Sequence, residues 1–147
     1  MNIEKFTDRA KGFLQAAQTI AMRENHQRVT SGHLLKALLD DEQGMASGLI
    51  RNAGGDANRA KLAVDAAIAR LPKVSGSGAQ LQWDQDVARL LDQAEQIAEK
   101  AGDSFVTVER LLLALALSGE TEAGRALKDA GVTAQSLNEA IEALRKG

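Results

Sequence analysis

Apolar residues recur at intervals of three and four in the first part of the chain, which is the spacing of one face of an α-helix. The first run extends to about Arg23 and contains six apolar positions: Ala10, Phe13, Leu14, Ala17, Ile20 and Ala21. Thr7 precedes this run, and its side-chain oxygen can accept a hydrogen bond from an unpaired amide at a helix start. The pattern therefore predicts a helix that Thr7 caps and that buries one face in a core.

The same pattern returns 77 residues later. The segment VTSGHLLKALL, which begins at Val29, matches VTVERLLLALA, which begins at Val106, and the match extends in both directions without a gap. About 16 of roughly 65 aligned positions are identical. Substitutions such as Val64 to Ile141 keep apolar character where a helical face needs it. The chain therefore contains a duplication.

Capping residues divide each copy into four predicted helices. The expected N-caps are Thr7, Thr30 and Asp56 in the first copy and Asp84, Thr107 and Thr133 in the second. Gly54 and Gly131 are expected to close the third helices, because glycine readily adopts the left-handed conformation of that position. The side chains expected to point inward from the second helices are Leu34, Leu35, Leu38, Leu111, Leu112 and Leu115.

This organisation predicts one all-α domain over residues 1–147, with eight helices arranged as two tandem four-helix repeats related by pseudo-twofold symmetry. Repeat one covers residues 6–70, a linker covers 71–82, and repeat two covers 83–147. The linker contains the only proline and a Ser-Gly run, which stop helix propagation. A four-helix unit of this size is marginal alone, so we expect the two repeats to pack face to face. Such a junction is a common place for a ligand groove.

The composition supports an all-α fold and disfavours nucleic acid and membranes as partners. Aromatic residues make up 3% of the chain, which disfavours a β-rich fold. The net charge of −2 provides no field for a phosphate backbone, so nucleic acid is not an expected partner. The chain has no cysteine, which suits a reducing compartment, and we expect a cytoplasmic location. The sequence shows neither an export signal nor a run of about 18 apolar residues, so no membrane partner is expected.

Motifs for catalysis or cofactor binding are missing from the sequence. The phosphate-loop pattern G-x-x-x-x-G-K-[ST] does not occur. His26 and His33 lack a partner three or four residues away that would complete a helical metal site, so we expect solvent-facing or capping histidines. No serine has the setting of a hydrolase nucleophile. We therefore expect no catalytic residue, metal or cofactor in this chain, and no enzyme activity.

Polar residues gather at the start of the second helix of the second copy. Carboxylates at Asp103 and Glu109 would complement the helix dipole there. Alternatively, Asp103, Glu109 and Thr7 would present acceptors beside the inter-repeat groove and bind basic or amide groups of a peptide; the two roles can coexist. The first copy has His26 and Gly32 at the positions of Asp103 and Glu109, so we expect an asymmetric site.

The pattern F-T-x-x-A, then V-T-x-x-[HR]-L-L-x-A-L in both copies, with L-P-K-V-S-G between them, resembles the Clp amino-terminal domain of ATP-dependent unfoldases, in particular of disaggregase chaperones. The resemblance covers essentially the whole chain. It implies an eight-helix domain at the front of a longer protein whose ATPase modules use ATP and magnesium and assemble into a homohexamer. The 147-residue chain by itself is expected to be monomeric.

The resemblance further implies a substrate-recruiting domain that binds unfolded or aggregated polypeptides in a shallow inter-repeat groove and works with the DnaK chaperone system. Thr7, Asp103 and Glu109 match surface residues linked to substrate handling in the family. Truncating each to alanine is expected to weaken peptide binding with little loss of fold. Two alternatives remain: an adaptor-docking domain of a Clp protease unfoldase, and a structural cap on the ATPase ring. Gly32 stands where the family commonly has glutamate, which disfavours the protease-linked alternative.

Overall fold

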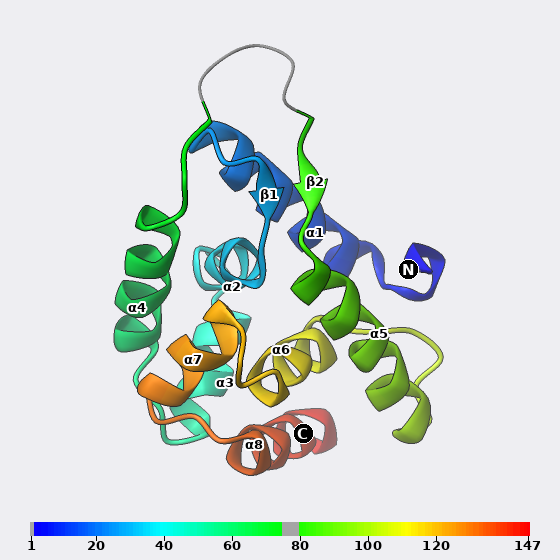
Figure 1. The fold of residues 1–147 in the computed structure, drawn as a ribbon. Coiled ribbons are helices and arrows are strands. Elements are labelled where there is room, and N and C mark those ends of the chain that lie inside the picture. The colour runs from blue at the N-terminus through cyan, green and yellow to red at the C-terminus, as the bar shows by residue number, and fades with distance from the viewer. Residues whose placement is uncertain (1, 75–79) are drawn as a thin grey trace.

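Residues 2–74 and 80–147 are described by a computed structural model (Figure 1). Over these residues the chain forms eight α-helices, one short 3₁₀ helix and two strands. The first copy contains the 3₁₀ helix η1 (Ile3–Lys5), α1 (Asp8–Arg23), β1 (Arg28–Val29), α2 (Ser31–Leu39), α3 (Met45–Asn52) and α4 (Ala57–Ala69). The second contains β2 (Gln82–Trp83), α5 (Gln85–Lys100), α6 (Val108–Leu117), α7 (Glu122–Asp129) and α8 (Ala134–Lys146). The all-α prediction is confirmed.

The four helices of the second copy each begin 77 residues after their counterparts in the first. Local capping accounts for these bounds, because the predicted caps accept a hydrogen bond from a backbone amide in the first turn of the helix at Thr7, Asp56, Asp84, Thr107 and Thr133. Gly54 and Gly131 follow α3 and α7 with φ of 87° and 85°, the left-handed conformation expected of them. The repeated bounds are consistent with the predicted pseudo-twofold arrangement.

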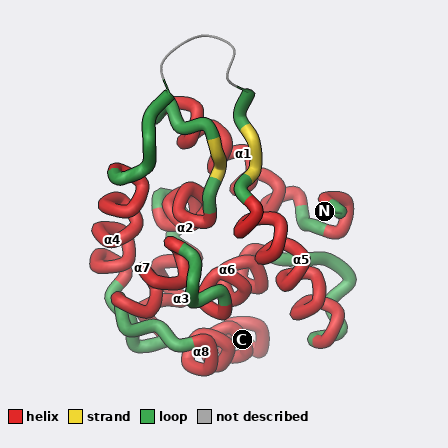
Figure 2. The backbone as a smooth tube through the Cα atoms, in the orientation of Figure 1, coloured by secondary structure: helices red, strands yellow, loops and turns green. Residues whose placement is uncertain are grey.

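The two copies exchange short extended segments. β1 pairs in parallel with β2, with Val29 opposite Trp83, and an isolated parallel bridge joins Phe6 to Val106. In each case the residue before the N-cap of the first helix of one copy pairs with the residue before the N-cap of the second helix of the other copy. The two strands lie side by side, and β1 contacts α1 (Figure 2). The sequence did not predict this exchange.

Both copies contribute to one continuous hydrophobic core. All six leucines predicted to point inward are buried, and Leu35 and Leu112 are fully inaccessible to solvent. Across the copies, α4 packs against α7 and α3 packs against α8.

The predicted linker, residues 71–82, is described only at its two ends, because residues 75–79 lie outside the described part of the chain. The amide of Val74 donates to the carbonyl of Asn25 at 2.8 Å, and the amide of Gln82 donates to that of Gln27 at 2.9 Å. Both ends are therefore held by the segment that leads into β1.

Candidate functional site

Thr7 lies where the start of α1 meets the second copy. Its hydroxyl oxygen accepts a hydrogen bond from the amide of Ala10 at 3.1 Å, which caps α1. Its own amide donates to the carbonyl of Val106 at 3.0 Å. Asp84, the counterpart of Thr7, donates in the same way to Val29 at 2.9 Å. Thr7 therefore belongs to a junction between the copies, and residues 103–109 form the other side of it.

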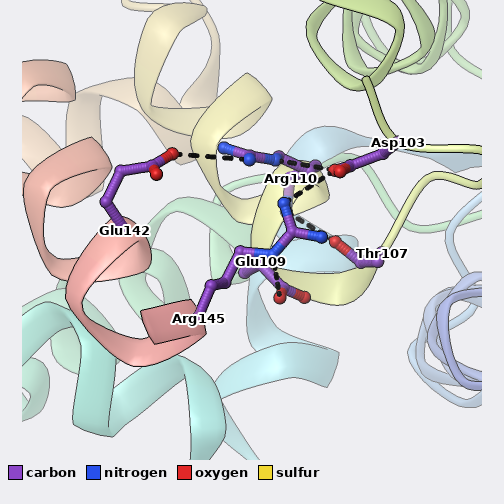
Figure 3. A network of polar contacts seen from close by, with 6 residues as sticks. All are labelled: Asp103, Thr107, Glu109, Arg110, Glu142 and Arg145. Atoms are coloured by element: carbon purple, nitrogen blue, oxygen red, sulfur yellow. Dashed lines mark hydrogen bonds and ion pairs between the residues drawn. The ribbon is translucent and has the colours of Figure 1, made fainter. Parts of the chain in front are cut away.

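Asp103 is the centre of an ion-pair network that joins the start of α6 to the end of α8 (Figure 3). Its Oδ2 accepts hydrogen bonds from Nε of Arg110 at 3.1 Å and from Nη1 of Arg145 at 2.9 Å. The outer members are Glu142, 3.5 Å from Nη2 of Arg110, and Glu109, 3.8 Å from Nε of Arg145. Asp103 and Glu109, two of the predicted substrate-binding residues, are thus brought together by one arginine.

The charges of this network stabilise the ionised form of Asp103. Burial raises the pKa of the Asp103 carboxyl, but the hydrogen bonds from Arg145 and Arg110 outweigh burial, so the pKa lies below its ordinary value. The Arg110 side chain is only 4% exposed. A buried guanidinium requires such a partner, because an unpaired buried charge is costly. The carboxylates of Asp103 and Glu109 therefore both form ion pairs within the chain, and these ion pairs connect α6 to α8.

The equivalent positions of the first copy hold a pair of histidines. His26 corresponds to Asp103 and His33 to Arg110, and Nδ1 of His26 lies 2.9 Å from Nε2 of His33. Both histidines are buried, so the expectation of a solvent-facing residue is wrong for each of them. Capping is confirmed for His33, whose Nδ1 accepts a hydrogen bond from the amide of Thr30 at 2.9 Å. Burial lowers the pKa of His33 to about 4.

Glu122, from the second copy, supplies the carboxylate that the first copy lacks at the start of α2. Its Oε2 accepts a hydrogen bond from the hydroxyl of Thr30 at 2.9 Å. A Cβ at position 32 would lie 2.6 Å from the same oxygen, so Gly32 leaves the space that this carboxylate occupies. Sequence reasoning missed Glu122. The available signal was the glycine itself, at a position where the other copy has a glutamate.

Asp86 joins the same polar cluster from the start of α5. Its Oδ2 accepts a hydrogen bond from the amide of Ser31 at 3.3 Å. The hydroxyl of Ser31 in turn accepts one from the amide of Ala123 at 3.2 Å. Burial, with a further contribution from Asp84, raises the pKa of Asp86 to about 6. The first turns of α2, α5 and α7 therefore meet in one polar cluster between the copies.

The surface between the copies is hollowed along α4 and α7. This α4–α7 groove has a volume of about 890 Å³. Alanines from both copies line it, namely Ala63, Ala67 and Ala126. Charged side chains also line it: Arg70, Glu122, Arg125, Lys128 and Asp129. The groove thus combines small apolar side chains with charges of both signs.

A smaller Asp103 hollow, about 380 Å³, lies between η1 and the end of α5. Asp103 lines it together with Lys5 and Phe105, and Phe105 is 53% exposed. Thr7 and Glu109 do not line this hollow. Arg145 joins Asp103 to Glu109, whereas Thr7 contacts the segment between them through the backbone of Val106. None of these three predicted residues lines the α4–α7 groove.

A metal site is not found within residues 2–74 and 80–147, where no group of three His, Cys, Asp or Glu side chains could hold an ion. None of the helices in that same part of the chain has the length and apolar character needed to cross a membrane.

Comparison with known proteins defines the class. Residues 5–130 match the family described as the Clp repeat N-terminal domain, and the chain belongs to this family. It is 56% identical over 147 residues to the chaperone protein ClpB of Agrobacterium fabrum; the match covers 100% of this chain and 17% of the relative. The chain is thus an N-terminal domain of the type found in ClpB chaperones, and it spans a small part of their length.

Solved structures show the same fold. The N-terminal domain of Hsp104 from Candida albicans has a TM-score of 0.80 and 20% identity, with 96% of this chain and 91% of that chain covered. A complex of the ClpV N-domain with a VipB peptide has a TM-score of 0.70 and 20% identity, with 92% and 83% covered. At this level of identity the likeness concerns the fold alone.

Proposed function

We propose that this domain recruits unfolded or aggregated polypeptides to an ATP-dependent protein disaggregase and that it holds them in the α4–α7 groove. The groove carries the proposal, because it is open, lies between the two copies and combines alanine surface with charged side chains. Unfolded chains expose apolar segments that folded proteins bury. A shallow site with few shape-specific contacts suits many unrelated sequences.

Two relatives support a role in binding polypeptide. ClpB of Agrobacterium fabrum is a chaperone by name. The ClpV N-domain, which shares the fold, forms a complex with a peptide. The α4–α7 groove is a place where such a segment would fit on this chain.

Thr7, Asp103 and Glu109 are proposed as a second contact region for the same substrates. Asp103 lines a hollow beside the exposed Phe105, and Arg145 pairs with both carboxylates. A basic group of a substrate would compete with Arg145 for them. Alanine at each of the three positions is expected to weaken binding of an unfolded protein, and unchanged affinity in all three variants would remove them as contacts.

The proposal places this domain, residues 1–147 with repeats at 6–70 and 83–147 joined by a linker at 71–82, in a longer cytoplasmic protein. That protein would bind ATP and magnesium, form a homohexamer and cooperate with the DnaK system. Micromolar or weaker contacts, about −8 kcal/mol or less favourable, would suffice for each domain. Several tethered domains raise the effective concentration around one aggregate.

The decisive experiment is an NMR titration of the ¹⁵N-labelled domain with reduced, carboxymethylated α-lactalbumin, which stays unfolded, and with native α-lactalbumin as control. The proposal expects shift changes at Ala63, Ala67 and Ala126 with the unfolded protein only. Changes with a folded adaptor instead would indicate an adaptor-docking domain. The absence of localised changes with any protein would favour a structural cap.

A matched pair of variants on α4 tests whether unfolded polypeptides bind in the α4–α7 groove. Ala67 lines the groove, whereas Ala69 is exposed on the same helix and does not line it. Ala67→Arg is expected to block the groove and reduce binding, and Ala69→Arg adds the same charge elsewhere. Equal affinity of the two variants would contradict the assignment to this groove.

A further inference from the structure

A third depression, the His26 cavity, lies between the segment before β1 and the segment that follows α4, and the first turns of α5 and α7 complete it. Its volume is about 330 Å³. His26, Leu71, Pro72, Asp86 and Glu122 are among the residues that line it. The α4–α7 groove adjoins it, since Leu71 and Glu122 line both.

Hydrogen bonds fix the positions of the histidine protons beside this cavity. The amide of Thr30 donates to Nδ1 of His33, so this nitrogen carries a lone pair. A neutral His33 therefore carries its proton on Nε2, which donates to Nδ1 of His26 at 2.9 Å. By the same reasoning the proton of a neutral His26 is on Nε2. Burial lowers the pKa of both rings, which favours the neutral forms that this chain of bonds requires.

Two polar atoms that belong to lining residues have no partner among the described residues. One is Nε2 of His26, a residue that is 5% exposed overall, and the other is Oδ1 of Asp86. Buried polar atoms in native proteins nearly always have a hydrogen-bond partner. The first atom is a donor and the second is an acceptor. A metal ion does not suit this pair, because Nε2 of His26 carries a hydrogen.

We propose that the His26 cavity binds an amide group of an extended polypeptide. The carbonyl oxygen of the amide accepts from Nε2 of His26, and its N–H donates to Oδ1 of Asp86. An amide offers both functions without charge, whereas an anion would face three lining carboxylates against one lining cation: Asp84, Asp86 and Glu122 against Arg28. Leu71 and Pro72 provide apolar surface for the adjoining carbon atoms. The proposal rests on the proposed function, since the ligand is part of a polypeptide client.

The amide has two possible sources, a backbone peptide group or the side chain of Asn or Gln. The chain contains two histidines, so ¹⁵N-histidine labelling reports on His26 and His33 alone. The free domain should show both rings protonated on Nε2. Titration with a capped peptide of Ala, Ser and Leu tests the backbone, and the same peptide with a central Gln tests the carboxamide. A change at Nε2 of His26 with both peptides identifies the backbone, and a change with the second alone identifies the side chain.

The outcomes separate this inference from the proposed function. Backbone shifts at Ala67 without a change at His26 would mean that the groove binds peptide and that the cavity holds only water, which overturns the inference. Changes at His26 without shifts at Ala67 would support the cavity and contradict the groove. No change at either position with any peptide would overturn both.

Variants at His26 and Asp86 test the two hydrogen bonds proposed between these residues and the amide group. His26→Gln keeps an N–H donor near the position of Nε2 and should retain peptide affinity, whereas His26→Phe keeps a ring without the donor and should weaken binding roughly 2- to 10-fold. Asp86→Leu removes the acceptor and should weaken binding to a similar extent, so it provides the test if His26→Phe does not fold. Wild-type affinity in the folded Phe or Leu variant would contradict the site.

Discussion

The carboxylate of Glu122 occupies the space beside Gly32, where an added Cβ would lie 2.6 Å from Oε2. This contact joins the first turn of α7 to that of α2 and makes position 32 dependent on the other copy. A methyl group at position 32 would displace the carboxylate from the hydroxyl of Thr30, its hydrogen-bond partner.

A double-mutant cycle measures this dependence. Alanine stabilises a helix over glycine by about 0.5–1 kcal/mol, so Gly32→Ala should stabilise the domain when Glu122 is also replaced by alanine. With Glu122 present, the gain should shrink or reverse because the carboxylate must move. Urea unfolding of the wild type, the two single variants and the double variant gives the coupling free energy between positions 32 and 122. Additive effects would mean that Glu122 moves aside without cost.

Truncating leucines on the inner faces of α2 and α6 should lower the free energy of unfolding strongly. Leu112 is fully buried, so Leu112→Ala should destabilise the domain by about 2–5 kcal/mol through lost burial and the cavity left behind. Leu35→Ala should behave alike, and Leu62, which is 71% exposed, provides the control. Thermal melting checks all three. A wild-type melting temperature for Leu112→Ala would refute the assignment of this face to the core.

Asp103 and Glu109 should differ in their contributions to stability. The sequence predicted little loss of fold for alanine at either position, but Asp103 is the close partner of Arg110, which is 4% exposed. Asp103→Ala should therefore cost about 1–3 kcal/mol, as expected when a buried donor loses its partner. Glu109 pairs at 3.8 Å with the partly exposed Arg145, so its loss should cost about 0–1 kcal/mol.

Unfolding at low pH tests whether the stability that Asp103 contributes comes from its charge. Its folded-state pKa is lowered, so its contribution is present above the unfolded value and is lost as the pH falls through the folded value. Chemical denaturation should show the difference between wild type and Asp103→Ala shrinking in strong acid. A difference that does not change with pH would assign the loss to packing instead of charge.

His33 and Asp86 should give opposite pH dependences. His33 has a folded pKa of about 4 against 6.5 when unfolded, so the unfolded chain binds more protons between these values and stability rises with pH. Asp86 has a folded pKa of about 6 against 3.8, so the folded chain binds more protons and stability falls as the pH rises. Asp86→Asn removes the second effect. The free energy of unfolding should then rise more steeply between pH 4 and 6 than in wild type, and parallel curves would contradict the shift at Asp86.

Much of the fold could be predicted because helix formation and capping are local. The first helix was expected to end near Arg23, and it ends there. The side chain of Thr30 is an instructive exception. It stands at the predicted cap position, yet its hydroxyl donates to Glu122, 92 residues away. A hydrogen bond of that range depends on how two units pack, and no local pattern encodes it.

The candidate site was predicted only in outline. The sequence singled out Asp103 and Glu109 as a pair of carboxylates, but the arginine that joins them, Arg145, lies 42 residues beyond Asp103. The histidines were expected to face solvent or to cap a helix, because polar side chains are usually exposed. Their burial depends on the tertiary structure, which places Nδ1 of His26 2.9 Å from Nε2 of His33.

The sequence by itself determined the duplication, the eight helices, five of their N-caps and the inward leucines, because each follows from hydrogen bonds and periodicity within a few residues. Only the tertiary structure decided that the copies exchange their extended segments, with Phe6 beside Val106 and Val29 beside Trp83. It also decided that Glu122 fills the space at Gly32 and that a groove opens along α4 and α7. These features depend on the relative placement of two similar units, and the free energy that selects one placement comes from contacts between residues far apart in the chain.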